Sequence, residues 1–167
     1  SISQSGLTNG SKLLACMLMI VGGSPAGTAG GIKTTTVAVL LLTAISVLRG
    51  NKDTECYGRK ITFEIIRVGI TITLVTFVFW LFGVTVMTVI EPQQKVLDLM
   101  FEATSAMATV GLTVDLTPVL SDISHVVLML MMYIGRIGPM TMALIFSGHV
   151  DKKNQFRTLP EAKIMVG

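Results

Sequence analysis

Two charged side chains interrupt long runs of apolar residues in this sequence. Lys33 lies in a run that extends over residues 12–49, and Arg136 lies in another over residues 122–151. A charge held inside a membrane span is costly and is a functional-site hypothesis by default. Lys33 could tune the occupancy of an ion pathway, or it could bond loop carbonyl groups at the start of a helix. Arg136 could obstruct such a pathway, or it could only hold the fold by bonding carbonyl groups.

The first apolar run is broken in its middle by a glycine-rich segment. Residues 22–33 read GGSPAGTAGGIK, and five glycines with Pro25 cannot hold a stable helix. The flanking residues 13–21 and 34–48 predict two half-helices, and neither is long enough to cross a membrane alone. Because irregular backbone at membrane depth must line a cavity or be covered by protein, we expect a transport pathway here. The alternative is a short turn outside the membrane between two short hydrophobic helices.

A second glycine follows a shorter apolar segment. Residues 96–108 predict a helix, Thr109-Val110-Gly111-Leu112 come next, and residues 113–121 are polar. This order indicates a re-entrant helix followed by an extended loop. Thr-Val-Gly after a short pore helix opens the filter signature of potassium channels, in which backbone carbonyl groups replace the hydration shell of the ion. A glycine allows the backbone angles that such a loop needs. The alternative is an ordinary glycine in an extracellular loop.

The composition of the chain predicts the membrane elements that must position these residues. Hydrophobic residues make up 51% of the 167 residues and charged residues 14%, with a mean hydropathy of +0.72. A soluble domain carries about 25% charged residues. Residues 70–90 predict one uninterrupted span that ends at Glu91-Pro92, since proline disfavours helix at the residue before it. The expected fold is an all-α integral membrane protein, in which a broken transmembrane helix precedes one helix–pore loop–helix repeat.

The distribution of charge predicts the orientation of these elements. Residues 49–60 carry four basic side chains and residues 151–167 carry four more, whereas residues 91–122 carry one basic and five acidic side chains. Cytoplasmic loops carry an excess of Lys and Arg. We therefore expect the loop and the tail to be cytoplasmic, and the N-terminus and residues 91–122 to be outside.

Counting along the helices from the cytoplasmic side predicts a gate. Residues 34–48 would rise roughly 22 Å, and residues 137–150 a similar distance, so the glycine-rich segment and Arg136 would lie at similar depth below the Thr-Val-Gly loop. We hypothesise that together they obstruct a pore. The residues assigned to this gate are Gly22, Gly23, Gly27, Thr28, Gly30, Gly31, Lys33 and Arg136.

Several other classes of function have no support in the sequence. It has no HExxH motif, no acid pair in a span and no catalytic Ser/His set, and His125 and His149 lie at opposite ends of one predicted helix. We therefore expect no enzyme, no cofactor and no resident metal. The net charge of +3 comes without a basic run interleaved with aromatics, so nucleic-acid binding is not expected. Ser1 opens the chain without a basic signal region, which predicts a fragment.

Three motifs in order, GGSPAGTAGGIKTTT, EATSAMATVGL and YIGRIGPMT, resemble the membrane subunit of the Trk/Ktr/HKT superfamily of potassium transporters, and the bacterial Ktr type most closely. The resemblance implies four helix–pore helix–helix repeats around one ion path. Residues 1–50 would then be the broken last helix of the third repeat, with an intramembrane gating loop at 22–33. Residues 51–60 would be a cytoplasmic loop, residues 61–150 the fourth repeat and residues 151–167 a cytoplasmic tail.

The same resemblance implies a function and partners. Potassium, or alternatively sodium, would pass a selectivity filter that includes Thr109, Val110, Gly111 and Leu112, with Arg136 facing the gating loop. The protein would be a homodimer in the lipid of the cell membrane, and its basic tail would face a cytosolic nucleotide-binding regulatory ring. The alternatives are a structural or coupling subunit of another membrane translocase, a membrane-embedded enzyme that uses Lys33 or Arg136, and a sodium-translocating relative.

Overall fold

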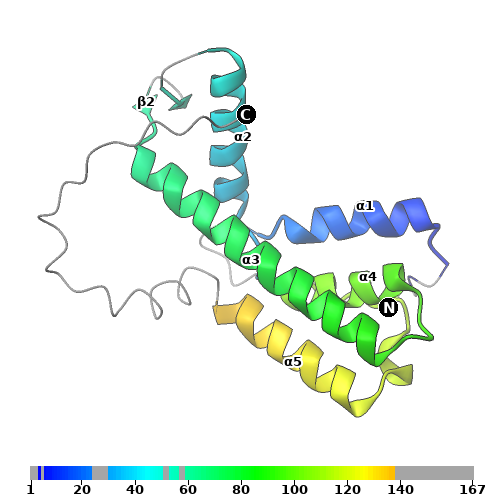
Figure 1. Cartoon of the computed structure of the whole chain (residues 1–167). Helices are drawn as coiled ribbons and strands as arrows, with labels where there is room; N and C mark the ends of the chain where they lie inside the picture. Colours follow the sequence, from blue (N-terminus) through cyan, green and yellow to red (C-terminus); the bar gives the residue numbers. More distant parts are fainter. Residues whose placement is uncertain (1–3, 5, 24–29, 51–52, 57–58, 138–167) are drawn as a thin grey trace, which may run out of the picture.

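The computed structural model describes residue 4 and residues 6–23, 30–50, 53–56 and 59–137 (Figure 1). This part of the chain is mostly helical, as the sequence predicts, with one short hairpin of two strands. The elements in chain order are α1 (Asn9–Ile20), α2 (Thr34–Leu48), β1 (Glu55–Cys56), β2 (Arg59–Lys60), α3 (Phe63–Ile90), α4 (Val96–Met107), the 3-10 helix η1 (Thr117–Val119) and α5 (Asp122–Ile137).

Helices α1 and α2 are the two expected half-helices on either side of the glycine-rich segment. The first begins at Asn9, before the predicted boundary, because the hydroxyl of Thr8 caps it by accepting the Ser11 N–H at 3.3 Å. The second spans Thr34–Leu48, the range that the sequence predicts. In Figure 1 the two halves point in different directions, with α1 beside α4 and α2 beside the start of α3. The break therefore separates two helices that pack against different neighbours.

Helix α3 is the one helix in the described ranges that is long and apolar enough to cross a membrane. Its 28 residues reach roughly 42 Å. It ends at Ile90, as predicted, and begins at Phe63, earlier than predicted. Five hydroxyl groups on α3 donate to the carbonyl oxygen four residues earlier, which satisfies them without water. These belong to Thr71, Thr73, Thr76, Thr85 and Thr88.

Helix α4 is short and is enclosed by the other helices. Residues 101–108 are all buried, and α4 packs against α1 on one side and against α3 and α5 on others. Side chains from α3, α4 and α5 form the larger core cluster, and Cys16 and Met19 of α1 pack with Phe101 of α4 in a second. Three helices of the described part, α1, α3 and α5, therefore cover the buried residues of α4.

The loop between α2 and α3 contains a hairpin that the sequence did not predict. Glu55 pairs with Lys60 across strands β1 and β2. The hydroxyl of Ser46 on α2 donates to the Asp53 carbonyl oxygen at 2.8 Å, and the Asp53 carboxylate forms an ion pair with Lys60 at 2.6 Å. These contacts hold the hairpin against the end of α2.

Candidate functional site

The loop predicted to be a filter begins at an unusual helix end. Three backbone hydrogen bonds close α4: Ala108 N–H to Thr104, Thr109 N–H to Ala106 at 3.1 Å and Val110 N–H to Ser105 at 3.0 Å. This is the Schellman arrangement, in which one residue takes left-handed backbone angles and is usually glycine. Here that residue is Thr109, with φ +53°. A β-branched residue in this region is strained, and such strain is typical of functional sites.

The side chain of Thr109 explains why a threonine occupies the position. Its Oγ1 accepts the backbone N–H of Gly30 at 2.9 Å. A Cβ at residue 30 would lie 2.8 Å from that oxygen and 3.1 Å from the Ala108 carbonyl oxygen. Residue 30 must therefore be a glycine for the two loops to meet. A glycine at 109 would relieve the strain but would leave the buried Gly30 N–H without this acceptor.

The glycine-rich segment is closed at its base by hydrogen bonds between its two ends. Gly22 N–H donates to Ile32 at 2.8 Å, Ile32 N–H to Ile20 at 3.1 Å, and Thr34 N–H to Gly23 at 3.3 Å. A Cβ at Gly22 would lie 2.1 Å from the Gly30 carbonyl oxygen. The two ends of the segment, which we call its neck, can therefore approach this closely only with glycine at residue 22. Gly27 and Thr28, which the sequence assigns to the gate, lie outside the described residues.

The residues predicted to form the filter are exposed within this chain. Val110 is 45% exposed and Leu112 is 40% exposed. Gly111 has φ +83°, and a Cβ built there would meet nothing within 4 Å. Within the described ranges no backbone N–H donates to the carbonyl oxygens of residues 109–112.

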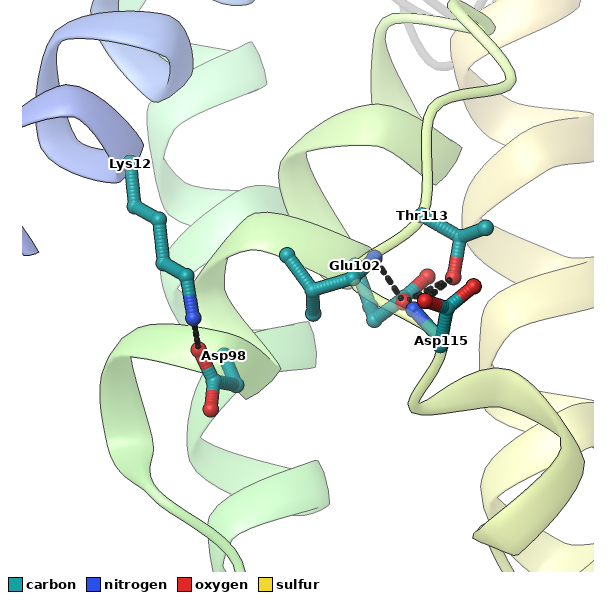
Figure 2. A network of polar contacts seen from close by, with 6 residues as sticks. Lys12, Asp98, Glu102, Thr113 and Asp115 are labelled. Carbon is teal, nitrogen blue, oxygen red and sulfur yellow. Dashed lines mark hydrogen bonds and ion pairs between the residues drawn. The ribbon is translucent and has the colours of Figure 1, made fainter. Parts of the chain in front are cut away.

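The segment after the filter is tied to α4 by Glu102. Figure 2 shows this side chain directed toward Thr113 and Asp115. The carboxylate of Glu102 accepts hydrogen bonds from Thr113 Oγ1 at 2.5 Å, from the Val114 N–H at 3.1 Å and from Thr117 Oγ1 at 3.1 Å. Glu102 is only 5% exposed, so these bonds compensate for burying its charge.

A second, partly buried contact joins α4 to α1, on the left of Figure 2. Lys12 Nζ lies 2.6 Å from Asp98 Oδ1, and the two side chains are 10% and 20% exposed. Lys12 lies on α1 and Asp98 on α4, and the resemblance assigns these two helices to different repeats. The ion pair therefore links the two units on the predicted outer side.

Arg136 lies in the last turn of the described part of α5, at a close approach of α5 to α4. A Cβ at the neighbouring Gly135 would lie 1.9 Å from the Met107 carbonyl oxygen.

Arg136 also lines a cavity of about 620 Å³ together with Thr109, Gly111 and Glu102. A second cavity of about 470 Å³ is lined by Thr109 together with Gly22 and Gly23. The structure thus brings Arg136, the filter loop and the neck of the glycine-rich segment together, while Lys33 occupies the N-cap position of α2.

Comparison with known proteins decides the family. The family model TrkH, described as a cation transport protein, matches residues 1–157. The chain belongs to the TrkH family. It is 34% identical over 167 residues to Ktr system potassium uptake protein B of Bacillus subtilis, and 34% identical over 170 residues to potassium/sodium uptake protein NtpJ of Enterococcus hirae. Both alignments cover 100% of this chain but only 37% and 38% of the relatives.

A third relative, Ktr system potassium uptake protein D of Bacillus subtilis, is 31% identical over 167 residues, which is 36% of its length. The predicted resemblance to the Trk/Ktr superfamily is therefore confirmed. The TrkH family consists of membrane transport proteins and not of enzymes. The chain spans less than two fifths of the curated relatives it matches, so it corresponds to a part of these proteins.

Three contacts that hold the candidate site together are not predicted by the sequence. The sequence indicates Glu102 and Asp98 only as acids of an outer segment, and Lys12 only as the boundary of an apolar run. One signal was available for Glu102, since an ionised side chain in the middle of a short apolar helix needs a partner when buried. The Gly30–Thr109 hydrogen bond joins residues 79 positions apart and has no local signal.

Proposed function

We propose that the complete protein takes up potassium ions across the cell membrane through a channel-like pore. The relatives named above are potassium uptake and potassium/sodium uptake proteins. The observation that carries the proposal is the loop at residues 109–112, whose carbonyl oxygens receive no backbone N–H within the described ranges and whose Gly111 has φ +83°. Carbonyl oxygens of this kind can replace the hydration shell of a cation. Residues 109–112 are then one selectivity-filter loop.

The gate in this proposal consists of the glycine-rich segment 22–33 and Arg136. Its support is the contact between Gly30 and Thr109, together with the cavities that the filter loop shares with Arg136 on one side and with Gly22 and Gly23 on the other. Movement of the segment would displace the filter loop, because Gly30 of the segment is hydrogen-bonded to Thr109 of the loop. Arg136 adds a positive charge that opposes cation passage until it moves.

The arrangement of repeats completes the proposal. Residues 1–50 form the broken last helix of a third repeat, residues 51–60 a cytoplasmic loop, residues 61–150 a fourth repeat and residues 151–167 a cytoplasmic tail. The transporter is a homodimer in the cell membrane with a cytosolic nucleotide-binding regulatory subunit on the side of the tail. Two relatives are named as proteins of a Ktr system, which supports a transporter with further components.

Rubidium uptake by potassium-starved cells tests the function. Cells that lack other potassium uptake systems and express the complete protein should accumulate rubidium, and sodium should compete poorly. Failure to accumulate rubidium, with sodium uptake in its place, would favour a sodium-translocating relative, a possibility that the name of NtpJ raises. Uptake of neither ion would favour the structural or coupling role.

The filter assignment is tested by Gly111→Ser with Gly50→Ser as its control. Both glycines have positive φ, +83° and +71°, and open space around a built Cβ, but Gly50 follows α2 far from the filter. A side chain in this region costs roughly 1–2 kcal/mol, so we expect the preference for rubidium over sodium to fall about tenfold in Gly111→Ser only. Equal preference for rubidium over sodium in the two variants would contradict the assignment of residues 109–112 as a filter.

A further inference from the structure

The carboxylate of Glu102 holds the segment that leaves the filter. It receives three hydrogen bonds, from two threonine hydroxyl groups and one backbone N–H, and all three donors lie between residues 113 and 117. Hydrogen bonds to an ionised acceptor are roughly twice as strong as those between neutral groups. One buried side chain on α4 therefore fixes a whole turn of the following chain.

The two hydroxyl groups also lie close to each other, and one of them accepts a backbone N–H. Thr113 Oγ1 lies 3.2 Å from Thr117 Oγ1, and it accepts the Asp115 N–H at 3.0 Å. Asp115 has φ +63°, a backbone conformation that L residues rarely adopt. The turn at residues 113–117 is thus held by a hydrogen bond within itself and by hydrogen bonds to Glu102.

This unit begins directly after the filter loop. At the other end of the loop, Thr109 is fixed by the Schellman bonds and by Gly30. Between these two anchors the filter residues are exposed, and Gly111 has no neighbour within 4 Å of a built Cβ. Within this chain, the backbone conformation of residues 110–112 therefore depends on the contacts that hold Thr109 before them and residues 113–117 after them.

We propose that Glu102 is a positioning residue for ion selection, which sets the direction of the filter carbonyl groups by anchoring Thr113, Val114 and Thr117. The proposal rests on the proposed function of residues 109–112 as a filter. Glu102 does not touch the ion in this account. It acts through the backbone that follows Leu112.

The charge of Glu102 is the property to be tested. A glutamine has nearly the same size, but its amide nitrogen cannot accept a hydrogen bond and its oxygen is a weaker acceptor than a carboxylate oxygen. Glu102→Gln should therefore loosen the turn without removing it. Glu102→Leu removes every acceptor and leaves the buried Val114 N–H without its partner.

The experiment measures rubidium uptake and its inhibition by sodium in cells that express the complete transporter. We expect Glu102→Gln to raise the KM for rubidium and to lower the preference for rubidium over sodium by about tenfold, the loss expected for one charge-assisted hydrogen bond. Glu102→Leu should show a larger change where it still assembles. A purely structural role would lower the maximal rate in proportion to the amount of protein and leave KM and selectivity unchanged.

Glu91→Gln is the matched control. Glu91 also accepts a backbone N–H, from Ser121 at 2.8 Å, and a hydroxyl hydrogen, from Ser124 at 2.9 Å, but these contacts join α3 to α5. This variant loses the same kind of bond and should keep KM and selectivity.

Gly111→Ser separates the two proposals. Altered selectivity in Gly111→Ser but not in Glu102→Gln would overturn the role of Glu102 and retain the filter. Unaltered selectivity in both would overturn the filter itself. A change of KM and selectivity in Glu91→Gln as large as in Glu102→Gln would also overturn the role of Glu102. The loss of any hydrogen bond in residues 91–124 would then be enough to change KM and selectivity.

Discussion

Thr109 has a backbone conformation that β-branched residues rarely adopt, and its hydroxyl group accepts the Gly30 N–H. Strain of this kind costs of order 1–3 kcal/mol and persists only where the surrounding structure holds it. In this chain, the hydrogen bond between Thr109 and Gly30 of the glycine-rich segment offsets this cost. At the scale of single residues, the site is therefore built from one strained threonine and the glycine that lets it come close.

Replacing Thr109 tests this bond. Thr109→Val keeps the shape of the side chain but removes the acceptor, so the buried Gly30 N–H loses its partner at a cost of about 1–3 kcal/mol. We expect the KM for rubidium to rise roughly tenfold or more. Thr109→Ser keeps the oxygen and should behave like the parent protein. If the valine and serine variants were equally impaired, the methyl group and not the hydrogen bond would be what matters.

Arg136→Ala tests the gate. Arg136 lines the cavity that borders Thr109 and Gly111, and removing its charge should lower the barrier to cations there. We expect a severalfold higher rubidium flux in this variant. Arg136→Lys, which keeps the charge, should give a smaller increase. Unchanged flux through Arg136→Ala in a fully assembled protein would count against the gate.

At the scale of elements, the sequence predicted most helix boundaries. Helix α2, the start of α4 at Val96 and the end of α3 before Pro92 lie where glycine, proline and polar residues mark them. The starts of α1 and α3 were placed too late, because a cap at Thr8 and a charged first turn at Glu64 extend each helix beyond its apolar core. Local signals therefore define where elements exist more reliably than where they begin.

The contacts between elements could not be predicted in the same way. Lys12 and Asp98 are 86 residues apart, and nothing in either neighbourhood identifies the other. The Gly30–Thr109 bond and the approach of Gly135 to Met107 likewise depend on how helices pack. The sequence supplied the motifs of the candidate site, whereas the polar contacts that position them needed the structure.

Gly135→Ala tests the packing of α5 on α4. The added Cβ would lie 1.9 Å from the Met107 carbonyl oxygen, and backbone cannot move aside as a side chain can. Overpacking of this kind costs about 1–3 kcal/mol or more, so the purified transporter should unfold at a lower temperature. Gly10→Ala in α1, where a Cβ meets nothing within 4 Å, is the control and should not lower the unfolding temperature. Equal unfolding temperatures of the two variants would contradict the close approach.

Acidification tests the junction of α3 and α5. Hydrogen bonds from the side chain and backbone of Ser121 and from the Ser124 hydroxyl group hold the pKa of Glu91 below its usual value. Because the folded-state pKa is lowered, the stabilisation is present above the pKa of an unfolded glutamate and is lost as the pH falls through the folded value. The parent protein should unfold at a higher temperature than Glu91→Gln at neutral pH, and the difference should shrink in acid. A difference that is independent of pH would contradict this assignment.

At the scale of the whole molecule, the chain matches only part of its relatives. It spans 37% and 38% of two of them, and the predicted filter residues Val110 and Leu112 are exposed within this chain. In the proposed architecture, other repeats complete the ring of carbonyl oxygens around the ion. Helix α3 then faces lipid, which agrees with its many exposed apolar side chains. In the same architecture, helix α4 would precede the filter loop, and the hydrogen bonds of Thr109 and Glu102 would anchor the two ends of the loop.

The position of the bound ion would show whether residues 109–112 form a filter. Crystals of the complete transporter grown in rubidium would give an anomalous signal at each bound ion. We expect a rubidium peak beside the backbone oxygens of residues 109–112, and its loss in Gly111→Ser. Rubidium bound elsewhere in the membrane region, with residues 109–112 on an outer surface and no ion beside them, would contradict it.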